Sequence, residues 1–378
     1  MTEMPGMGGP GMGGMGSDDS SAPGFDHVIT PWDGTKADDG ANDKIDSSNS
    51  DIYHEANTFT EKVNVVYSGS SATVTVSDGS KVLYRTDGAY VTIDMLTNSV
   101  KNVEITASGV SGDGQLKIYG DKKFKLTLNG LDLTSSRGPA INDQCKKRVF
   151  VHLADGTTNT LTDCAKYSTE PYYLTATGET DEDRKGCFFS EGNMIFSGTG
   201  VLQVAGRYKH GIVTDGYMWM RPGVTLVVTE AAKNAVHVKG DATDNIGLHM
   251  EGGLLYTNVS STAGKGIKTD LHAEILGGRL LLNQSGDATY DEGDQDTSSA
   301  AGIKTDGNVI ISGGTHVIKS TGTGGKGINA DGTLLISGGE TTITTTGGCY
   351  YKSAGLTSSP KGVKADGNID ITGGTLNI

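Results

Sequence analysis

The sequence predicts an all-β protein: a right-handed single-stranded parallel β-helix, a solenoid of stacked coils, preceded by a disordered N-terminal tail. The first observation is internal repetition, because the Asp-Gly steps recur at spacings of 25 to 36 residues. The second is a series of short runs, such as 72–76 and 123–128, in which apolar and polar residues alternate. The third is that no segment shows a helical period. Six segments align as repeats, the first two more weakly: 184–204, 209–228, 264–282, 300–318, 325–343 and 360–378.

Each repeat reads as a strand, an Asp-Gly turn, a second strand, a Gly-Gly corner and a third strand. One coil of a parallel β-helix needs this content in about 25 residues, whereas a propeller blade needs longer units with antiparallel hairpins. In the first strand, alternation points Ile303 and Thr305 inward and Lys304 and Asp306 outward. The Gly pairs suit a bend where a side chain would clash. Stacking then predicts one inward column: Ile267, Ile303, Ile328 and Val363.

Residues 1–60 are predicted to be a low-complexity Met/Gly tail with an acidic linker, and residues 61–378 one β-helix domain whose coils are clearest from residue 184 onward. No run of about 18 apolar residues exists, so no membrane span is expected. Neither a signal peptide nor a lipid anchor is recognised in the sequence. The formal charge of −14 argues against a nucleic-acid partner, because phosphate binding needs a basic face. An acidic polysaccharide would need bridging cations or a locally basic groove.

The longer coils carry their extra residues at one place, just after the third strand, at about 162–184, 283–299 and 344–360. Insertions at one point of a stacked coil emerge along one edge, which in repeat proteins commonly binds the ligand. Aromatic rings stack on sugar faces, and carboxylates accept hydrogen bonds from hydroxyls. The alternative is that the acidic loops only confer solubility and the tyrosines pack on the coil beneath. The predicted ligand-binding residues are Tyr172, Tyr173, Tyr290, Tyr350 and Tyr351.

Stacking also predicts a file of carboxylates at the Asp-Gly turns, about 4.8 Å apart: Asp270, Asp306, Asp331 and Asp366. Two readings remain open. Lysines two residues upstream, Lys268, Lys304 and Lys364, would interleave with the carboxylates as a salt ladder, or Ca²⁺ would lie between coils as the cofactor. Asn329 replaces the lysine in one coil, so we expect Asp331 to have the weakest compensation and to be the first candidate for a bound cation.

Two stretches of sequence and the repeats that follow them carry a resemblance to a known family. LTLNGLDLTSS is followed by GTTNTLTD, and then by repeats of the form G[IV]KADGN[VI]xI[ST]GGT. In these features residues 60–378 resemble bacterial carbohydrate-binding β-helix domains, long catalogued as a domain of unknown function. The resemblance implies a fold similar to that of pectate lyases, binding of cellulose-like or polygalacturonate chains, and Ca²⁺ on the helix. The segments 233–241 and 271–274 depart from the Asp-Gly form and interrupt the file.

The sequence therefore predicts an extracellular or cell-surface protein that holds a plant-type or acidic polysaccharide on a β-helix face and is not an enzyme. One alternative is a calcium-dependent, pectate-type polysaccharide lyase, in which Lys304 or Lys364 would be the base. The recurrence of these lysines in the scaffold argues against it, since a catalytic base is normally a singular residue. Another alternative is a surface adhesin or structural stalk. The sequence ends on the last strand of a repeat, so further β-helix coils or a partner are expected at that end.

Overall fold

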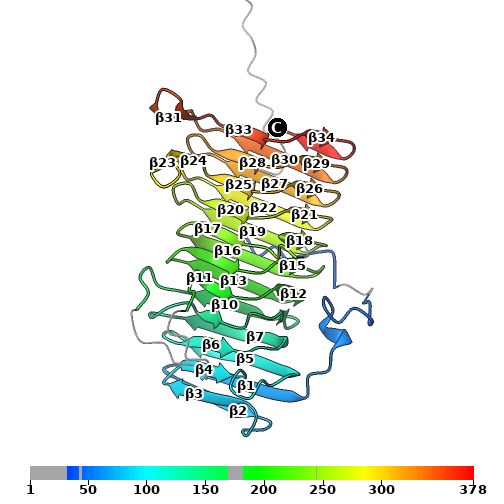
Figure 1. Cartoon of the computed structure of the whole chain (residues 1–378), viewed down its shortest axis with the longest axis vertical. Helices are drawn as coiled ribbons and strands as arrows, with labels where there is room; N and C mark the ends of the chain where they lie inside the picture. Colours follow the sequence, from blue (N-terminus) through cyan, green and yellow to red (C-terminus); the bar gives the residue numbers. More distant parts are fainter. Residues whose placement is uncertain (1–31, 42–44, 169–181, 244) are drawn as a thin grey trace, which may run out of the picture.

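The computed structural model describes residues 32–41, 45–168, 182–243 and 245–378, and in this part the chain is all-β. The only helical segment there is the three-residue 3-10 helix η2 (His54–Ala56). Most strands pair in parallel, and they are stacked in layers from β1–β4 at one end to β33–β35 at the other (Figure 1). The prediction of an all-β, β-helix-like arrangement is confirmed. Residues 1–31 of the predicted tail and linker lie outside the described residues.

The stack is built from two large sheets, one of 20 strands (sheet A) and one of 11 strands (sheet B). Along the chain, successive coils add one strand to sheet B and then one to each of two rows of sheet A. The 11-residue strand β7 pairs with both β9 and β10 and so joins the two rows. Sheet B contains β3 (Leu83–Asp87), β4 (Tyr90–Asp94), β6 (Gln115–Tyr119), β8 (Ile141–Asp143), β11 (Gly186–Ser190), β14 (His210–Thr214), β17 (Asn234–Val238), β20 (Lys265–Thr269), β25 (Ala301–Thr305), β28 (Lys326–Ala330) and β33 (Lys361–Ala365).

Sheet A begins with β1 (Glu61–Ser68), β2 (Ser71–Val76), β5 (Val103–Ser111) and β7 (Phe124–Thr134). Its first row contains β9 (Val149–Leu153), β12 (Met194–Gly198), β15 (Met218–Met220), β18 (Leu248–Met250), β21 (Ala273–Ile275), β26 (Val309–Ile311), β29 (Leu334–Ile336) and β34 (Ile369–Ile371). Its second row contains β10 (Thr158–Thr162), β13 (Val201–Gly206), β16 (Thr225–Ala231), β19 (Leu254–Val259), β22 (Arg279–Gln284), β27 (Thr315–Ser320), β30 (Glu340–Thr345) and β35 (Thr375–Asn377). Two antiparallel hairpins stand apart: β23 (Thr289–Asp291) with β24 (Asp296–Ser298), and β31 (Tyr350–Ser353) with β32 (Leu356–Ser358).

The core is a continuous column of apolar side chains enclosed by the three rows. The predicted inward column is confirmed, because Ile267 pairs with Ile303, Ile303 with Ile328, and Ile328 with Val363. The three isoleucines are fully buried, and Val363 packs against the same core while partly buried. The outward residues Lys304 and Asp306 are half-buried and exposed, as the alternation predicts. Burying these side chains stabilises the stack by about 1.5–3 kcal/mol for each residue.

The Gly-Gly corners meet a steric requirement at the second glycine of each pair. Gly314 and Gly339 have φ of 93° and 77°, a region that favours glycine. A Cβ on Gly339 would lie 2.7 Å from both Gly313 C and Gly314 O of the preceding corner. Corners therefore stack backbone on backbone, which explains why the pair recurs in the repeats.

The described part of the predicted linker lies against sheet A rather than away from it. Trp32 packs against a buried apolar cluster on the second row. The carboxylate of Asp39 accepts hydrogen bonds from the backbone N–H groups of Gly223 and Gly253. Farther along, Arg221 donates to both carboxylate oxygens of Glu55 at 3.1 and 2.9 Å. This segment thus covers one side of the stack (Figure 1).

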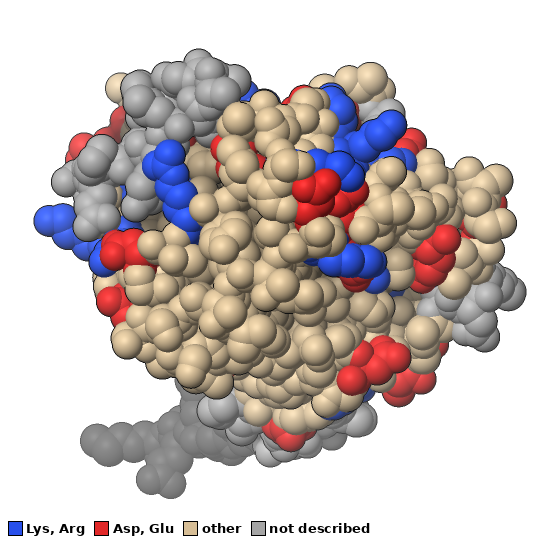
Figure 2. Space-filling view, turned by 90° about the horizontal axis from the view of Figure 1, so that it is seen from below, with Lys and Arg blue, Asp and Glu red and all other residues tan. Residues whose placement is uncertain are grey.

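The surface at the end of the stack formed by β1–β4 is mostly uncharged. Figure 2 views this end, and uncharged side chains cover most of it. The lysines and aspartates that the repeats supply lie on the face of sheet B instead, on layers nearer the other end. Within the described residues, no helix has the length and apolarity needed to cross a bilayer.

Candidate functional site

A groove runs along the outer face of sheet B, across the strands from β14 to β33. It consists of two adjoining hollows of about 850 and 520 Å³. Both hollows are lined by Lys265, Asp291, Ser298 and Lys304, so they form one continuous depression, here called the sheet B groove. The C-terminal ends of these strands, with the Asp-Gly turns, form one side of the groove, here called the strand-end bank. The N-terminal ends of the strands, beside the β23–β24 and β31–β32 hairpins, form the other side, here called the strand-start bank.

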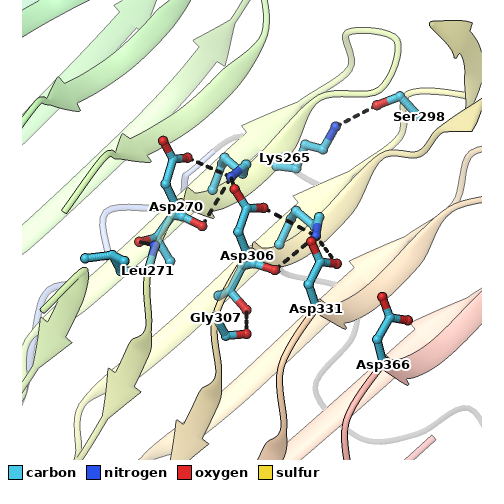
Figure 3. A network of polar contacts seen from close by, with 12 residues as sticks. Lys265, Asp270, Leu271, Ser298, Asp306, Gly307, Asp331 and Asp366 are labelled. Atoms are coloured by element: carbon cyan, nitrogen blue, oxygen red, sulfur yellow. Dashed lines mark hydrogen bonds and ion pairs between the residues drawn. The ribbon is translucent and has the colours of Figure 1, made fainter. Parts of the chain in front are cut away.

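The bank at the strand ends is a ladder of ion pairs (Figure 3). Lys268 Nζ lies 2.7 Å from Asp270 Oδ1 and 2.7 Å from Asp306 Oδ2 in the next coil. Lys304 contacts Asp306 at 3.5 Å and pairs more closely with Asp331. At the end of the ladder, Lys364 pairs with Asp366 at 2.6 Å. Each ammonium except the last bridges two carboxylates, which offsets the repulsion between neighbouring coils.

This geometry favours the salt ladder over an ion between coils. Ca²⁺ needs six to eight oxygen ligands, and here the oxygens that face each other hold ammonium groups. The four predicted metal ligands therefore do not fit Ca²⁺ while the lysines stay in place. Among the described residues, Asp331 has one cation within 4.0 Å, Lys304 of the preceding coil. Asp366 likewise has only Lys364, whereas Asp270 and Asp306 each have two such partners. Asn329 replaces the lysine in its own coil, but the ammonium group that pairs with Asp331 belongs to the neighbouring coil.

The ladder continues past the predicted file through two histidines. His237 stands in register with Lys268 and contacts Asp270 at 3.4 Å through Nε2. Its Nδ1 lies 3.2 Å from Nε2 of His210, whose pKa burial lowers to about 2, so that ring is neutral. Burial alone would raise the pKa of Asp270, but hydrogen bonds from His237 and Lys268 outweigh it and hold that pKa well below its ordinary value. The sequence segment 233–241 thus replaces a lysine by a histidine.

A second acidic group lies beyond the groove, at β11 and β14. Asp183, Glu191 and Asp215 place their carboxylates within 4.8 Å of one another. Lys185 Nζ contacts Asp183 at 2.7 Å and Asp215 at 2.5 Å, so an ammonium already neutralises this group. Burial raises the pKa of Glu191.

The bank at the strand starts carries lysines of a different kind. In the described part of the chain, five lysines that line the groove have no carboxylate within 4.0 Å: Lys209, Lys233, Lys265, Lys326 and Lys361. Lys265 Nζ donates to Ala263 O at 2.7 Å and to Ser298 Oγ at 3.1 Å (Figure 3). Burial and the charge of Lys233 lower the pKa of Lys265 to about 8. Burial and the charge of Lys361 likewise lower the pKa of Lys326 to about 8.

The sequence prediction singled out other lysines as candidate bases. Lys304 and Lys364 line the groove, but both are ion-paired with aspartates. Lys265 and Lys326, with the lowered pKa values, were missed. The signal was present in the repeats, where a lysine precedes the Gly-Ile step in GKGI at 264–267 and 325–328.

The predicted tyrosines lie on the hairpins rather than in the groove. Tyr290 belongs to β23 and Tyr350 and Tyr351 to β31, and Lys352 Nζ lies 5.3 Å from the Tyr290 ring centre. Tyr351 is 69% exposed, so its ring is available beside the groove. Tyr172 and Tyr173 lie outside the described residues. The sequence analysis missed Tyr208, which lines the larger hollow and stacks on Tyr167 at 3.9 Å.

The chain is similar to known proteins in both sequence and structure. A family model described as carbohydrate-binding domain-containing protein matches residues 87–243 and 321–378, more than half of the chain. A carbohydrate-binding domain-containing protein of Acetivibrio thermocellus is 30% identical over 131 residues, which cover 32% of this chain and 43% of that relative. This chain therefore spans less than half of that relative's length. The polysaccharide lyase-like protein from C. thermocellum matches in structure with a TM-score of 0.50 and 18% identity, over 84% of this chain and all of that one. That likeness concerns the fold.

Proposed function

This chain belongs to the family of carbohydrate-binding domain-containing proteins, and we propose that it binds a polysaccharide lengthwise in the sheet B groove without cleaving the polysaccharide backbone. Its fold is like that of a polysaccharide lyase-like protein. The observation that carries the proposal is the continuity of the groove from β14 to β33. Those six strands span roughly 24 Å at about 4.8 Å per step, so several sugars of one chain can contact successive coils. A compact site for one small molecule would need no such length.

The charges of the groove favour an acidic polysaccharide. The whole chain carries a formal charge of −14, yet five groove lysines lack carboxylate partners among the described residues. Lys233 and Lys361 are exposed and face the groove, so their ammonium groups are available to uronate carboxylates. These ammonium groups can attract an anionic polymer locally, although Asp291, Asp294 and Asp296 of the hairpin also line the groove. A neutral cellulose-like chain would use the tyrosines of the hairpins instead.

Three finer statements belong to the same proposal. The fold is a right-handed parallel β-helix, supported by the three parallel rows. The protein acts outside the cell or on its surface, where polymers of this kind are met. Calcium stays a prediction of the family resemblance, since the aspartate file is occupied by lysines.

A polysaccharide lyase of the pectate type is the second candidate, and one observation favours it. Such an enzyme needs an amine that is neutral near neutral pH, and Lys265 in the groove has its pKa lowered to about 8. The non-cleaving proposal stands ahead because the family model that matches is that of a carbohydrate-binding domain, whereas the likeness to the lyase-like protein concerns the fold.

Affinity electrophoresis in gels containing polygalacturonate or a soluble cellulose derivative tests the binding proposal. The double variant Lys233→Gln and Lys361→Gln should bind polygalacturonate about fivefold more weakly, from two exposed charge contacts of about 0.5 kcal/mol each. Lys62→Gln is the matched control, because Lys62 is 51% exposed on β1, at the far end of the stack. Equal retardation of the double variant, the control and the native chain would contradict the proposed groove.

A further inference from the structure

A buried lysine and two serines meet in the smaller hollow of the sheet B groove. Lys326 Nζ donates to Ser299 Oγ at 2.7 Å, to Ser358 Oγ at 2.6 Å and to Gly324 O at 3.3 Å. The two serine oxygens lie 2.6 Å from each other, and Ser358 Oγ also donates to Gly324 O at 3.1 Å. Three groups that can exchange protons are thus in mutual hydrogen-bond contact.

The three residues come from separate elements. Lys326 begins β28, Ser299 follows β24, and Ser358 ends β32. Lys326 and Ser358 are buried, at 7% and 4% exposed, whereas Ser299 is half-buried and lines the hollow. A molecule in the groove can therefore approach Ser299 while the other two remain shielded from water.

The surroundings favour a neutral amine at Lys326. Its hydrogen-bond partners are uncharged, and in the described part of the chain no carboxylate pairs with it. Burial and the nearby charges of Lys361 and Lys364 outweigh the opposing charge of Asp296 and lower its pKa to about 8. An amine in that state accepts a proton from a serine hydroxyl, as in serine hydrolases that use lysine as the base.

We propose that Ser299 is the nucleophile and Lys326 the general base of an esterase that removes O-acyl groups from the polysaccharide held in the sheet B groove, with Ser358 as a bridging hydroxyl. This inference rests on the proposed binding function and adds a reaction to it. O-acyl esters are the fitting substrate class, because the reaction needs only an electrophilic carbonyl beside the sugar chain and water.

The steps balance without a cofactor. Ser299 Oγ bonds to the ester carbonyl carbon, and its proton passes to Nζ of Lys326, directly or through Ser358. The bond between that carbon and the sugar oxygen then breaks, and Lys326 returns the proton to the sugar oxygen. Water hydrolyses the acyl-serine by the same route, which releases the carboxylic acid and restores Ser299. Lys361 and Lys364 line the same hollow and add positive charge near the developing oxyanion.

A lysine at the same register position two coils earlier, Lys265, lacks the second hydroxyl. Lys265 contacts Ser298 at 3.1 Å and a backbone carbonyl (Figure 3). No second serine of the described residues bonds to that pair, so it lacks the bridging hydroxyl. The triad is therefore a singular feature and does not follow from the repeat.

The test uses the full chain with a fluorophosphonate probe, para-nitrophenyl acetate and a chemically acetylated cello-oligosaccharide. We expect the probe to modify Ser299, identified by peptide mass, and acetate release to increase with pH through about 8, as Lys326 becomes neutral. Ser299→Ala should abolish both. Lys326→Arg, which keeps the charge but not the base, should lower acetate release about a hundredfold or more. Ser353→Ala, an exposed serine on β31, is the matched control and should retain full activity.

The outcomes separate the two proposals. A native chain that binds polysaccharide in electrophoresis but is not labelled at Ser299 would overturn the esterase and leave binding intact. Acetate release that persists in Ser299→Ala would overturn it as well. Labelling at Ser299 in a chain that retains no polysaccharide would support the esterase chemistry and refute the binding proposal. Labelling of the native chain needs no variant, so a folding defect in Ser299→Ala would not obscure the result.

Discussion

Removing Lys268 tests whether the ion-pair ladder stabilises the stack. Lys268 bridges Asp270 and Asp306 at 2.7 Å each, and it is the best-centred ammonium of the ladder. In Lys268→Met the stem is kept, so packing is largely preserved while the charge disappears. The two carboxylates of adjacent coils then face each other, with His237 as the remaining partner of Asp270.

The size of the effect follows from the spacing and the exposure. Two carboxylates about 4.8 Å apart repel by about 0.9 kcal/mol in water and by about 3.5 kcal/mol at an effective dielectric of 20. Asp270 and Asp306 are 40% and 45% exposed, so solvent screens much of this repulsion. We expect Lys268→Met to lower the free energy of unfolding by about 1–2 kcal/mol at neutral pH.

The pH dependence gives the prediction its sign. The folded-state pKa of Asp270 is depressed, so its contribution to stability is present above the unfolded value of about 3.9 and is lost as pH falls through the folded value. The variant lacks most of that contribution. The difference in unfolding free energy between native chain and variant should therefore be full near pH 7 and shrink below about pH 4.

Urea denaturation followed by circular dichroism measures this difference at each pH. Lys62→Met is the control, because Lys62 pairs with one carboxylate, Glu104, at 2.6 Å and is 51% exposed. Lys62→Met should lower the free energy of unfolding by less than about 0.5 kcal/mol. A Lys268→Met variant as stable as the control, or one whose deficit is the same at both pH values, would refute the ladder as a source of stability.

Three further predictions concern metal, activity and core. Because Lys304 already neutralises Asp331, Asp331→Asn should lower the melting temperature equally with and without Ca²⁺; a Ca²⁺-dependent rise that the variant loses would place an ion on the file. Polygalacturonate incubated with the protein at about pH 8 should yield no ultraviolet-absorbing unsaturated uronate, and product formation that depends on Lys265 would establish a lyase. In urea denaturation, Ile303→Ala should lower the free energy of unfolding by about 2–5 kcal/mol, and Val363→Ala, at a partly buried position, should lower it distinctly less. Equal losses in the two variants would contradict the inward column.

The sequence predicted features that repeat, since a stacked coil copies each position into its neighbours. Alternation correctly placed Ile303 inside and Lys304 outside, and the Gly-Gly pairs marked the corners where Gly314 has positive φ. It placed the aspartate file in register and allowed a salt ladder between coils, but it did not show that the lysine that pairs with Asp331 belongs to the preceding coil. The side-chain direction that decides such a pairing is not part of the repeat pattern.

Features that occur once were not predicted. The contact between Asp39 and the corner at Gly223 joins residues 184 positions apart, and the Asp-rich, Gly-rich sequence around Asp39 does not predict it. The Lys326 triad depends on how two insertions fold back over one strand. Single-sequence patterns carry no information on such loop geometry, which is set by tertiary packing.

The division between repeated and singular features also separates structural from chemical roles in the groove. Lys268 and Lys304 recur with their aspartates and neutralise one another, so the strand-end bank gives the stack a surface with little net charge of its own. The strand-start bank has no aspartate of the file, but the insertions bring Asp291, Asp294 and Asp296 to it, together with the hydroxyl groups that contact Lys326. A ligand that seeks positive charge or a free amine is therefore drawn to the strand-start bank, and variation in the insertions can change the chemistry there without disturbing the coils beneath.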